Sequence, residues 1–221
     1  MNYQQIVDTA LGYADRQDSE IVNNIPLFLK MVEARINRIL STQKMSTTMV
    51  TPLISGVSVY PLPPDYLALI LAGFVTTAPG LNVLAYLTPR ELAESMLSDQ
   101  TAINNQNFIP AYTVSGNMLK LNFVPSDDYA TNNSLSVEYY QQIPPLVPLD
   151  PLNPSVVDSN WISTLNPDCY IFGLLVEINA FVKDATAVPL WDARFKETLE
   201  SIEVQDSTYV WGGPALTVRV C

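Results

Sequence analysis

The feature that most constrains the fold of this chain is an apolar stripe within Ile25–Leu40. Its apolar residues recur every three or four positions, which is the spacing of one face of an α-helix. The stripe consists of Ile25, Phe28, Leu29, Val32, Ile36, Ile39 and Leu40. Asn24 is a suitable cap for such a helix, and Pro26 would then occupy a first-turn position where its missing N–H costs little. Because one helix cannot bury this stripe alone, other segments must cover it.

Strong helical partners for this stripe occur only near the end of the chain. Asn166-Pro167-Asp168 is a cap followed by proline, and Cys169–Lys183 is apolar on most faces, which is typical of a helix buried between neighbours. A last helix is expected near Pro189, and a shorter amphipathic pattern spans 3–14. We therefore predict an antiparallel bundle built from both ends of the chain. The stripe would also fit one of several unrelated core helices.

Between these helical segments the pattern is that of short β-strands. Residues 42–51 are rich in Thr, Ser and β-branched residues, and 67–76 is a nearly continuous apolar run. Ser115-Gly116-Asn117 is a hairpin signal, and Leu135–Tyr140 alternates between apolar and polar residues. A short helix with a capping box is expected over Thr88–Leu97. About six short strands favour a small antiparallel sandwich or barrel inserted into the bundle.

The sequence thus predicts an α+β protein with a divided bundle. Residues 1–41 and 155–208 form the discontinuous bundle, and 42–154 form the inserted β-rich domain with a proline-rich connector. Residues 209–221 form a C-terminal arm, in which Gly212-Gly213-Pro214 interrupts regular structure before an alternating segment. That segment has two interpretations. It either joins its own β region or has no fixed structure, or it adds to a sheet edge of another chain.

The charge balance restricts the partners of the chain. It has 22 acidic and 11 basic residues, a net charge of −11, and no basic cluster. Tight binding of nucleic acid through its phosphates is therefore not expected. The acidic surface either repels DNA or only keeps the protein soluble. The apolar runs are too short to cross a membrane and the N-terminus has no secretory pattern, so we expect a protein of the cytoplasmic side.

The composition also removes most catalytic and metal-binding chemistry. There is no histidine and there are two cysteines, which excludes histidine-dependent nucleophiles, a zinc site and a disulfide scaffold. Asp127-Asp128 indicates a turn rather than a metal site. We expect no catalytic, cofactor or metal site. Glu177, within an apolar helix, needs a positive partner, and we expect Arg35 or Arg38 to form a structural ion pair with it.

The order of several motifs resembles the head-to-tail adaptor, or head completion, proteins of short-tailed bacteriophages. The resemblance extends over nearly the whole chain, to about residue 208. It is carried by Ile6–Tyr13, Ile25–Phe28, Glu33–Arg38, Tyr60–Tyr66, the Tyr112–Leu121 hairpin, Asn160-Trp161, Leu174–Glu177, Lys183-Asp184 and Trp191.

This resemblance implies a structural virion protein. Such adaptors form a ring, dodecameric by analogy, that joins the portal protein of the head to the tail nozzle or tail tubular protein. The ring continues the DNA channel without tight DNA binding, and it assembles in the host cytoplasm without a membrane partner. The resemblance also implies that the C-terminal arm reaches along the portal. We expect the docking residues of this arm to be Trp211, Gly212, Gly213, Leu216, Val218 and Val220.

Two further questions stay open at the level of sequence. The acidic residues facing DNA would come from the first helix region or from the last helix: Asp8, Asp15, Asp18 and Glu20, or Glu197, Glu200 and Glu203. The alternative function is a cell-surface or carbohydrate-binding module in the β insertion, which would use exposed Tyr112, Tyr129, Tyr139 and Tyr140. An enzyme that uses carboxylates is the least favoured class.

Overall fold

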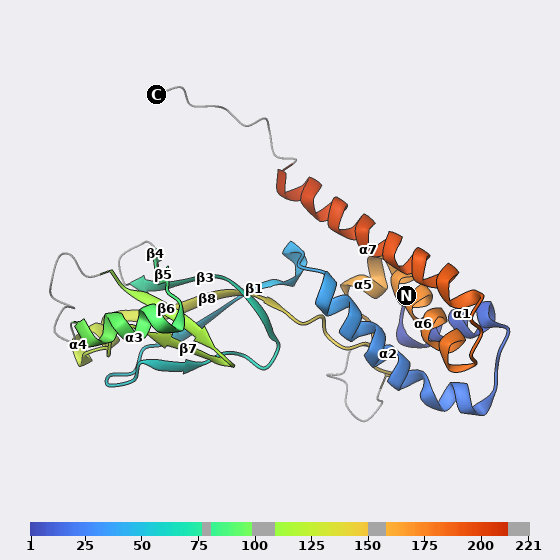
Figure 1. Cartoon of the computed structure of the whole chain (residues 1–221), viewed down its shortest axis with the longest axis horizontal. Helices are drawn as coiled ribbons and strands as arrows, with labels where there is room; N and C mark the ends of the chain where they lie inside the picture. Colours follow the sequence, from blue (N-terminus) through green and yellow to red (C-terminus); the bar gives the residue numbers. More distant parts are fainter. Residues whose placement is uncertain (77–80, 99–108, 150–157, 212–221) are drawn as a thin grey trace, which may run out of the picture. The chain divides into compact units, whose positions relative to one another are not determined.

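The computed structural model describes residues 1–76, 81–98, 109–149 and 158–211. The chain divides into two compact units. The helical unit contains Met1–Lys44 and Ile143–Cys221, and the β unit contains Met45–Gln142. Within the described residues there are seven α-helices and eight strands, so the predicted α+β class is confirmed (Figure 1).

The helical unit is organised around one central helix. Its helices are α1 (Tyr3–Ala14), α2 (Ser19–Ile39), α5 (Trp161–Leu165), α6 (Pro167–Phe181) and α7 (Ala187–Trp211). Helix α6 contacts α1, α2, α5 and α7, and its side chains are buried on most faces (Figure 1). Pro167 occupies its first turn, as the sequence indicated. Segments from both ends of the chain therefore share one core.

Helix α2 begins earlier than the sequence indicated. Its N-cap position is Asp18, so Asn24 is not the cap and Pro26 lies inside the helix. Ile21 is 1% exposed and extends the buried stripe by a further turn. The apolar area buried by this turn offsets the backbone hydrogen bond that Pro26 cannot donate. Ile39 was wrongly assigned to the stripe: it is 45% exposed, because Leu40 takes the buried place at the helix end.

The β unit contains two four-stranded sheets, with more strands than predicted. The first sheet has the order β1-β8-β3-β4 and the second has the order β2-β7-β6-β5. All pairs are antiparallel except β5 with β6. The strands are β1 (Ser46–Pro52), β2 (Val59–Pro61), β3 (Tyr66–Thr76), β4 (Leu81–Val83), β5 (Ala85–Tyr86), β6 (Ala111–Ser115), β7 (Met118–Leu121) and β8 (Asn133–Gln141).

Both sheets contribute to one core, which is the arrangement of a sandwich. Phe74, Leu135 and Val137 come from the first sheet, and Leu119 and Leu121 come from the second. The hairpin between β6 and β7 forms as the sequence indicated, with Gly116 in a left-handed conformation at φ 62°.

Two short helices complete the β unit. Helix α3 (Pro89–Ser98) has the expected capping box, in which the Glu91 carboxylate accepts from the Thr88 N–H at 2.8 Å. Helix α4 (Asp127–Asn132) lies where the sequence suggested only a turn. Ser126 caps it by accepting from the Tyr129 N–H, and the two aspartates lie in its first turn, where their charge favours a helix.

The boundaries of the units differ in three places from those predicted. Residues 42–44 belong to the helical unit, whereas the sequence placed them in the insertion. Residues from Ile143 cluster with the helical unit, whereas the sequence grouped the connector with the insertion. Within the connector, 143–149 has no regular secondary structure, and 150–157 lies outside the described residues. Helix α7 continues through Trp211, so residues 209–211 of the predicted arm are helical, and 212–221 lies outside the described residues.

Candidate functional site

The structure brings Glu177 and Arg35 together across the helical unit. Arg35 Nη1 of α2 lies 3.6 Å from Glu177 Oε1 of α6, and the two side chains are 23% and 11% exposed. Arg38, the other predicted partner, points elsewhere and is exposed, and its Nε donates to the Ala34 carbonyl. The geometry therefore selects Arg35, because Arg38 is exposed and bonds to a carbonyl of its own helix.

Arg35 also contacts α7, which the sequence did not indicate. Its Nη2 forms an ion pair with Asp192, and its guanidinium carbon lies 4.8 Å from the centre of the Phe195 ring. Asp192 also pairs with Lys196 at 2.7 Å. Hydrogen bonds from Lys196 and from Arg35 lower the pKa of the Asp192 carboxyl. Arg35 thus connects α2, α6 and α7 through one guanidinium group.

A second polar network attaches the connector to the helices. Leu146 N–H donates to Glu33 Oε1 at 2.6 Å, and the Tyr170 hydroxyl hydrogen-bonds to the same carboxylate. Asn160 donates to the Tyr170 hydroxyl at 2.7 Å and to the Pro144 carbonyl at 2.8 Å. Asn160 also caps α5 by accepting from the Ser163 N–H. Residues from α2, α5, α6 and the connector are therefore held by one set of hydrogen bonds.

This network perturbs the titration of its two acidic groups. Burial raises the pKa of Glu33, and the hydrogen bonds from Leu146 and Tyr170 lower it in part. Burial and the nearby charge of Glu33 raise the pKa of Tyr170. A raised pKa is expected for both acids, because they lie in a structural network that is only partly exposed to solvent. The proline content of the connector was visible in the sequence, but these long-range partners were not.

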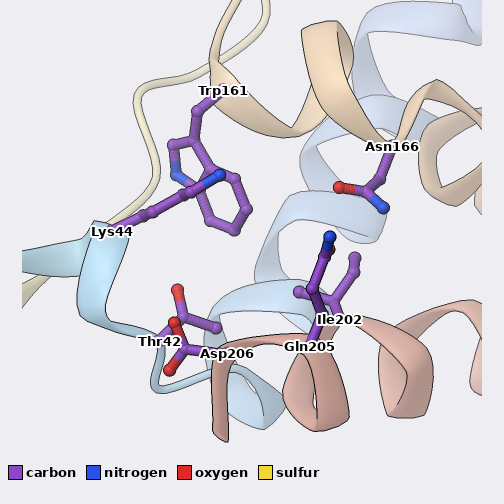
Figure 2. Close-up of a pocket in the computed structure, with 7 residues that line it drawn as sticks. All are labelled: Thr42, Lys44, Trp161, Asn166, Ile202, Gln205 and Asp206. Carbon is purple, nitrogen blue, oxygen red and sulfur yellow. The ribbon is translucent and has the colours of Figure 1, made fainter. Parts of the chain in front are cut away.

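A small pocket lies where the chain leaves α2 and meets the second half of α7. Figure 2 shows its lining, which is Thr42, Lys44, Trp161, Asn166, Ile202, Gln205 and Asp206. Its volume of about 20 Å³ has room for one water molecule and none for an organic ligand. The Thr42 hydroxyl is buried and has no hydrogen-bond partner among the described residues.

The contacts around this pocket are those of a structural joint. Lys44 lies over the ring of Trp161, with its Nζ 5.5 Å from the ring centre (Figure 2). Both carboxylate oxygens of Asp206 accept from the Gln43 N–H at 3.1 Å. The pocket thus fixes residues 42–44 against α5 and α7. Its size and these contacts favour a packing role over ligand binding.

The tyrosines proposed for carbohydrate binding are mostly unavailable. Tyr112 is 6% exposed and Tyr139 is 5% exposed, and both belong to the sandwich core. Tyr129 packs edge-on against Phe74 and Phe123, and Tyr140 is only partly exposed. The prediction of four exposed rings was wrong, because strand alternation places Tyr112 and Tyr139 on inward faces. The observation that favoured a carbohydrate-binding module is therefore removed.

The described residues offer little reactive chemistry. No group of three or more His, Cys, Asp or Glu side chains in them could hold a metal ion. Cys169 is fully buried, and burial raises the pKa of its thiol to about 12, so the thiol stays protonated at neutral pH. Among the helices that the structure describes, none is long and apolar enough to cross a membrane.

The predicted arm residues can be placed only in part. Trp211 is the last residue of α7. The remaining five, Gly212, Gly213, Leu216, Val218 and Val220, lie outside the described residues. The docking role of the arm therefore stays a prediction.

Comparison with known proteins agrees with the resemblance seen in the sequence. A search of curated proteins returned no match. Residues 1–218 match the family described as SU10 adaptor protein, which is nearly the whole chain and includes both units. The chain therefore belongs to the SU10 adaptor protein family, a family of structural adaptor proteins of bacteriophages.

Proposed function

We propose that this protein forms a dodecameric ring that joins the portal of a phage head to the nozzle or tail tubular protein and continues the DNA channel. The family match over residues 1–218 is the observation that carries this proposal. The fold is consistent with it, because the helical unit is fixed internally by the Arg35 contacts and by the Glu33 network. Such internal contacts suit a structural subunit that must keep its shape.

The acidic surface supports a channel through which DNA moves. Two sets of carboxylates are exposed to solvent, one on and after α1 and one on α7. Carboxylates that face a lumen repel phosphates over a Debye length of about 8 to 10 Å, which keeps DNA centred without binding it. Portal, tail-side protein and further copies of the chain are the proposed partners, and the virion is the proposed location.

The proposed docking arm provides a direct test. Deletion of residues 212–221 should abolish co-sedimentation with the purified portal protein, because the alternating apolar residues of the arm would supply the contacts. The melting temperature and circular dichroism should stay unchanged, since the described contacts of the helical unit come from residues before this segment.

Two full-length variants test whether portal binding depends on the sequence of the arm rather than on its length. Leu216→Ser with Val218→Ser and Val220→Ser should weaken portal binding as the deletion does. Thr217→Ser with Arg219→Gln changes the other side of the alternating segment and should leave binding intact. Unchanged portal affinity of the deletion variant would show that the arm does not dock the protein.

A further inference from the structure

The helical unit carries two exposed helix faces of opposite character. The α2 outer face consists of Leu27, Lys30, Met31, Ala34 and Arg38, which lie opposite the buried stripe of that helix. Leu27 is 55% exposed and Met31 is 45% exposed. Exposed apolar side chains at helical spacing that are flanked by two cations form an unpartnered helix surface.

The α7 outer face consists of Ala193, Glu197, Glu200 and Val204, which are all exposed. Its spacing of four, three and four residues equals that of Leu27, Met31, Ala34 and Arg38 on α2. Each stripe extends for about 16 Å along its helix axis. The two surfaces therefore match in length and periodicity, with carboxylates on one and cations on the other.

The charges on these faces have no oppositely charged partner among the described residues. Lys30, Arg38, Glu197 and Glu200 form no ion pair within the part of the chain that the structure describes. The neighbouring Lys196 forms an ion pair with Asp192, so its charge does not neutralise the carboxylates of the α7 outer face. In a chain with a net charge of −11, such a local cationic surface would reduce the repulsion between associating copies.

We propose that the occupant of the α2 outer face is the α7 outer face of a second copy of this chain. The inference rests on the proposed ring and names the contact between its neighbouring subunits. A contact between two different faces is heterologous, so each copy uses one face toward each of its two neighbours, and the assembly is a ring when the rotation between neighbours closes. The α7 carboxylates then serve subunit contact, which leaves the acidic residues of the α1 region to face the DNA.

Disulfide trapping of the full-length protein tests the contact. Ala34→Cys and Ala193→Cys are each made in a Cys221→Ser background. The remaining native cysteine, Cys169, is fully buried and should not cross-link. A mixture of the two variants should form a dimer cross-linked through the two introduced thiols under mild oxidation, with or without portal protein. Dimers formed equally well by the Ala34→Cys variant alone would indicate a symmetric contact and overturn the proposal.

Charge exchange provides the second test. Lys30→Glu with Arg38→Glu, and separately Glu197→Lys with Glu200→Lys, should each reduce assembly by about tenfold or more, since like charges then meet. A mixture of the two variants should regain assembly, because each wild-type face finds a wild-type partner and each reversed face a reversed one. Glu94→Lys with Asp127→Lys is the matched control, because both residues are exposed and lie outside the two faces, and it should assemble normally.

Measurement of portal binding distinguishes a failure of this inference from a failure of the proposed function. If the wild-type protein binds portal but no cross-link forms and charge exchange changes nothing, the contact is wrong and the adaptor function stands. If the cross-link forms in solution but the protein never binds portal, the contact stands and the adaptor function is wrong. Absence of both the cross-link and portal binding overturns both proposals.

Discussion

Arg35 makes charged and aromatic contacts with two other helices of the helical unit. It pairs with Glu177 and Asp192 and lies over Phe195, so it connects three helices. The sequence indicated that Glu177 needs a cation, since an unpaired carboxylate in an apolar helix is costly. It could not choose between Arg35 and Arg38, because the choice depends on which side of α2 faces α6. The ion pair with Asp192 could not be predicted either, because it depends on where α7 packs against α2.

Replacement of Arg35 by methionine should lower the free energy of unfolding by about 2 to 4 kcal/mol, since Glu177 loses its partner in a site that is only 11% exposed. The matched variant Arg38→Met removes an exposed arginine and should change it by less than about 0.5 kcal/mol. Urea unfolding of both proteins measures the difference. Equal stabilities would show that the Arg35 ion pairs do not support the fold.

The Glu33 network should give the stability a defined pH dependence. Burial raises the pKa of Glu33 above its ordinary value of 4.5, so the folded state holds this proton more tightly than the unfolded chain. The resulting stabilisation is fully present below the unfolded pKa and is lost as the pH rises through the folded pKa. Relative to Glu33→Gln, the wild type should therefore become less stable as the pH rises from about 4 toward neutrality.

Asp192 serves as the internal control for this measurement. Its pKa is lowered by Lys196 and Arg35, so its contribution is present above the unfolded pKa and lost as the pH falls through the folded one. The difference in unfolding free energy between wild type and Asp192→Asn should therefore have the opposite slope in acid. Parallel pH profiles of the two variants would contradict the assigned surroundings of both carboxyls.

At the scale of elements, helix α6 determines how the others pack. Gly173 lies where α6 meets α2 and α7, and an added Cβ would be 2.6 Å from Val32 Cγ1 and 3.2 Å from Phe195 Cε2. A glycine in a helix costs about 1 kcal/mol relative to alanine, but here it permits close helix packing. The sequence indicated a helix that is apolar on most faces, and the structure gives that pattern its physical reason.

Gly173→Ala should therefore lower the free energy of unfolding by about 1 to 3 kcal/mol, since the methyl group overpacks the contact. Gly12→Ala in α1 is the matched control, because a Cβ there meets no atom within 4 Å. It should stabilise the protein by about 0.5 to 1 kcal/mol. Thermal melts of the two variants should shift in opposite directions, and a shift in the same direction would contradict the packing described for α6.

Helix types and the hairpin were predictable from the sequence, but several boundaries were not. The 115–117 turn and the Thr88 capping box depend on neighbouring residues, so local pattern sufficed. The start of α2 was missed because Pro26 favours a first turn, while burial of Ile21 depends on partners far along the chain. The inward positions of Tyr112 and Tyr139 likewise required the strand register.

At the scale of the whole molecule, family membership and the division into two units support an adaptor, while ring formation and portal docking are proposals. The most direct test is electron microscopy of the full-length protein mixed with its cognate portal. We expect a ring of extra density, coaxial with the portal and open at its centre. Portal particles that stay bare at saturating protein concentration would contradict it.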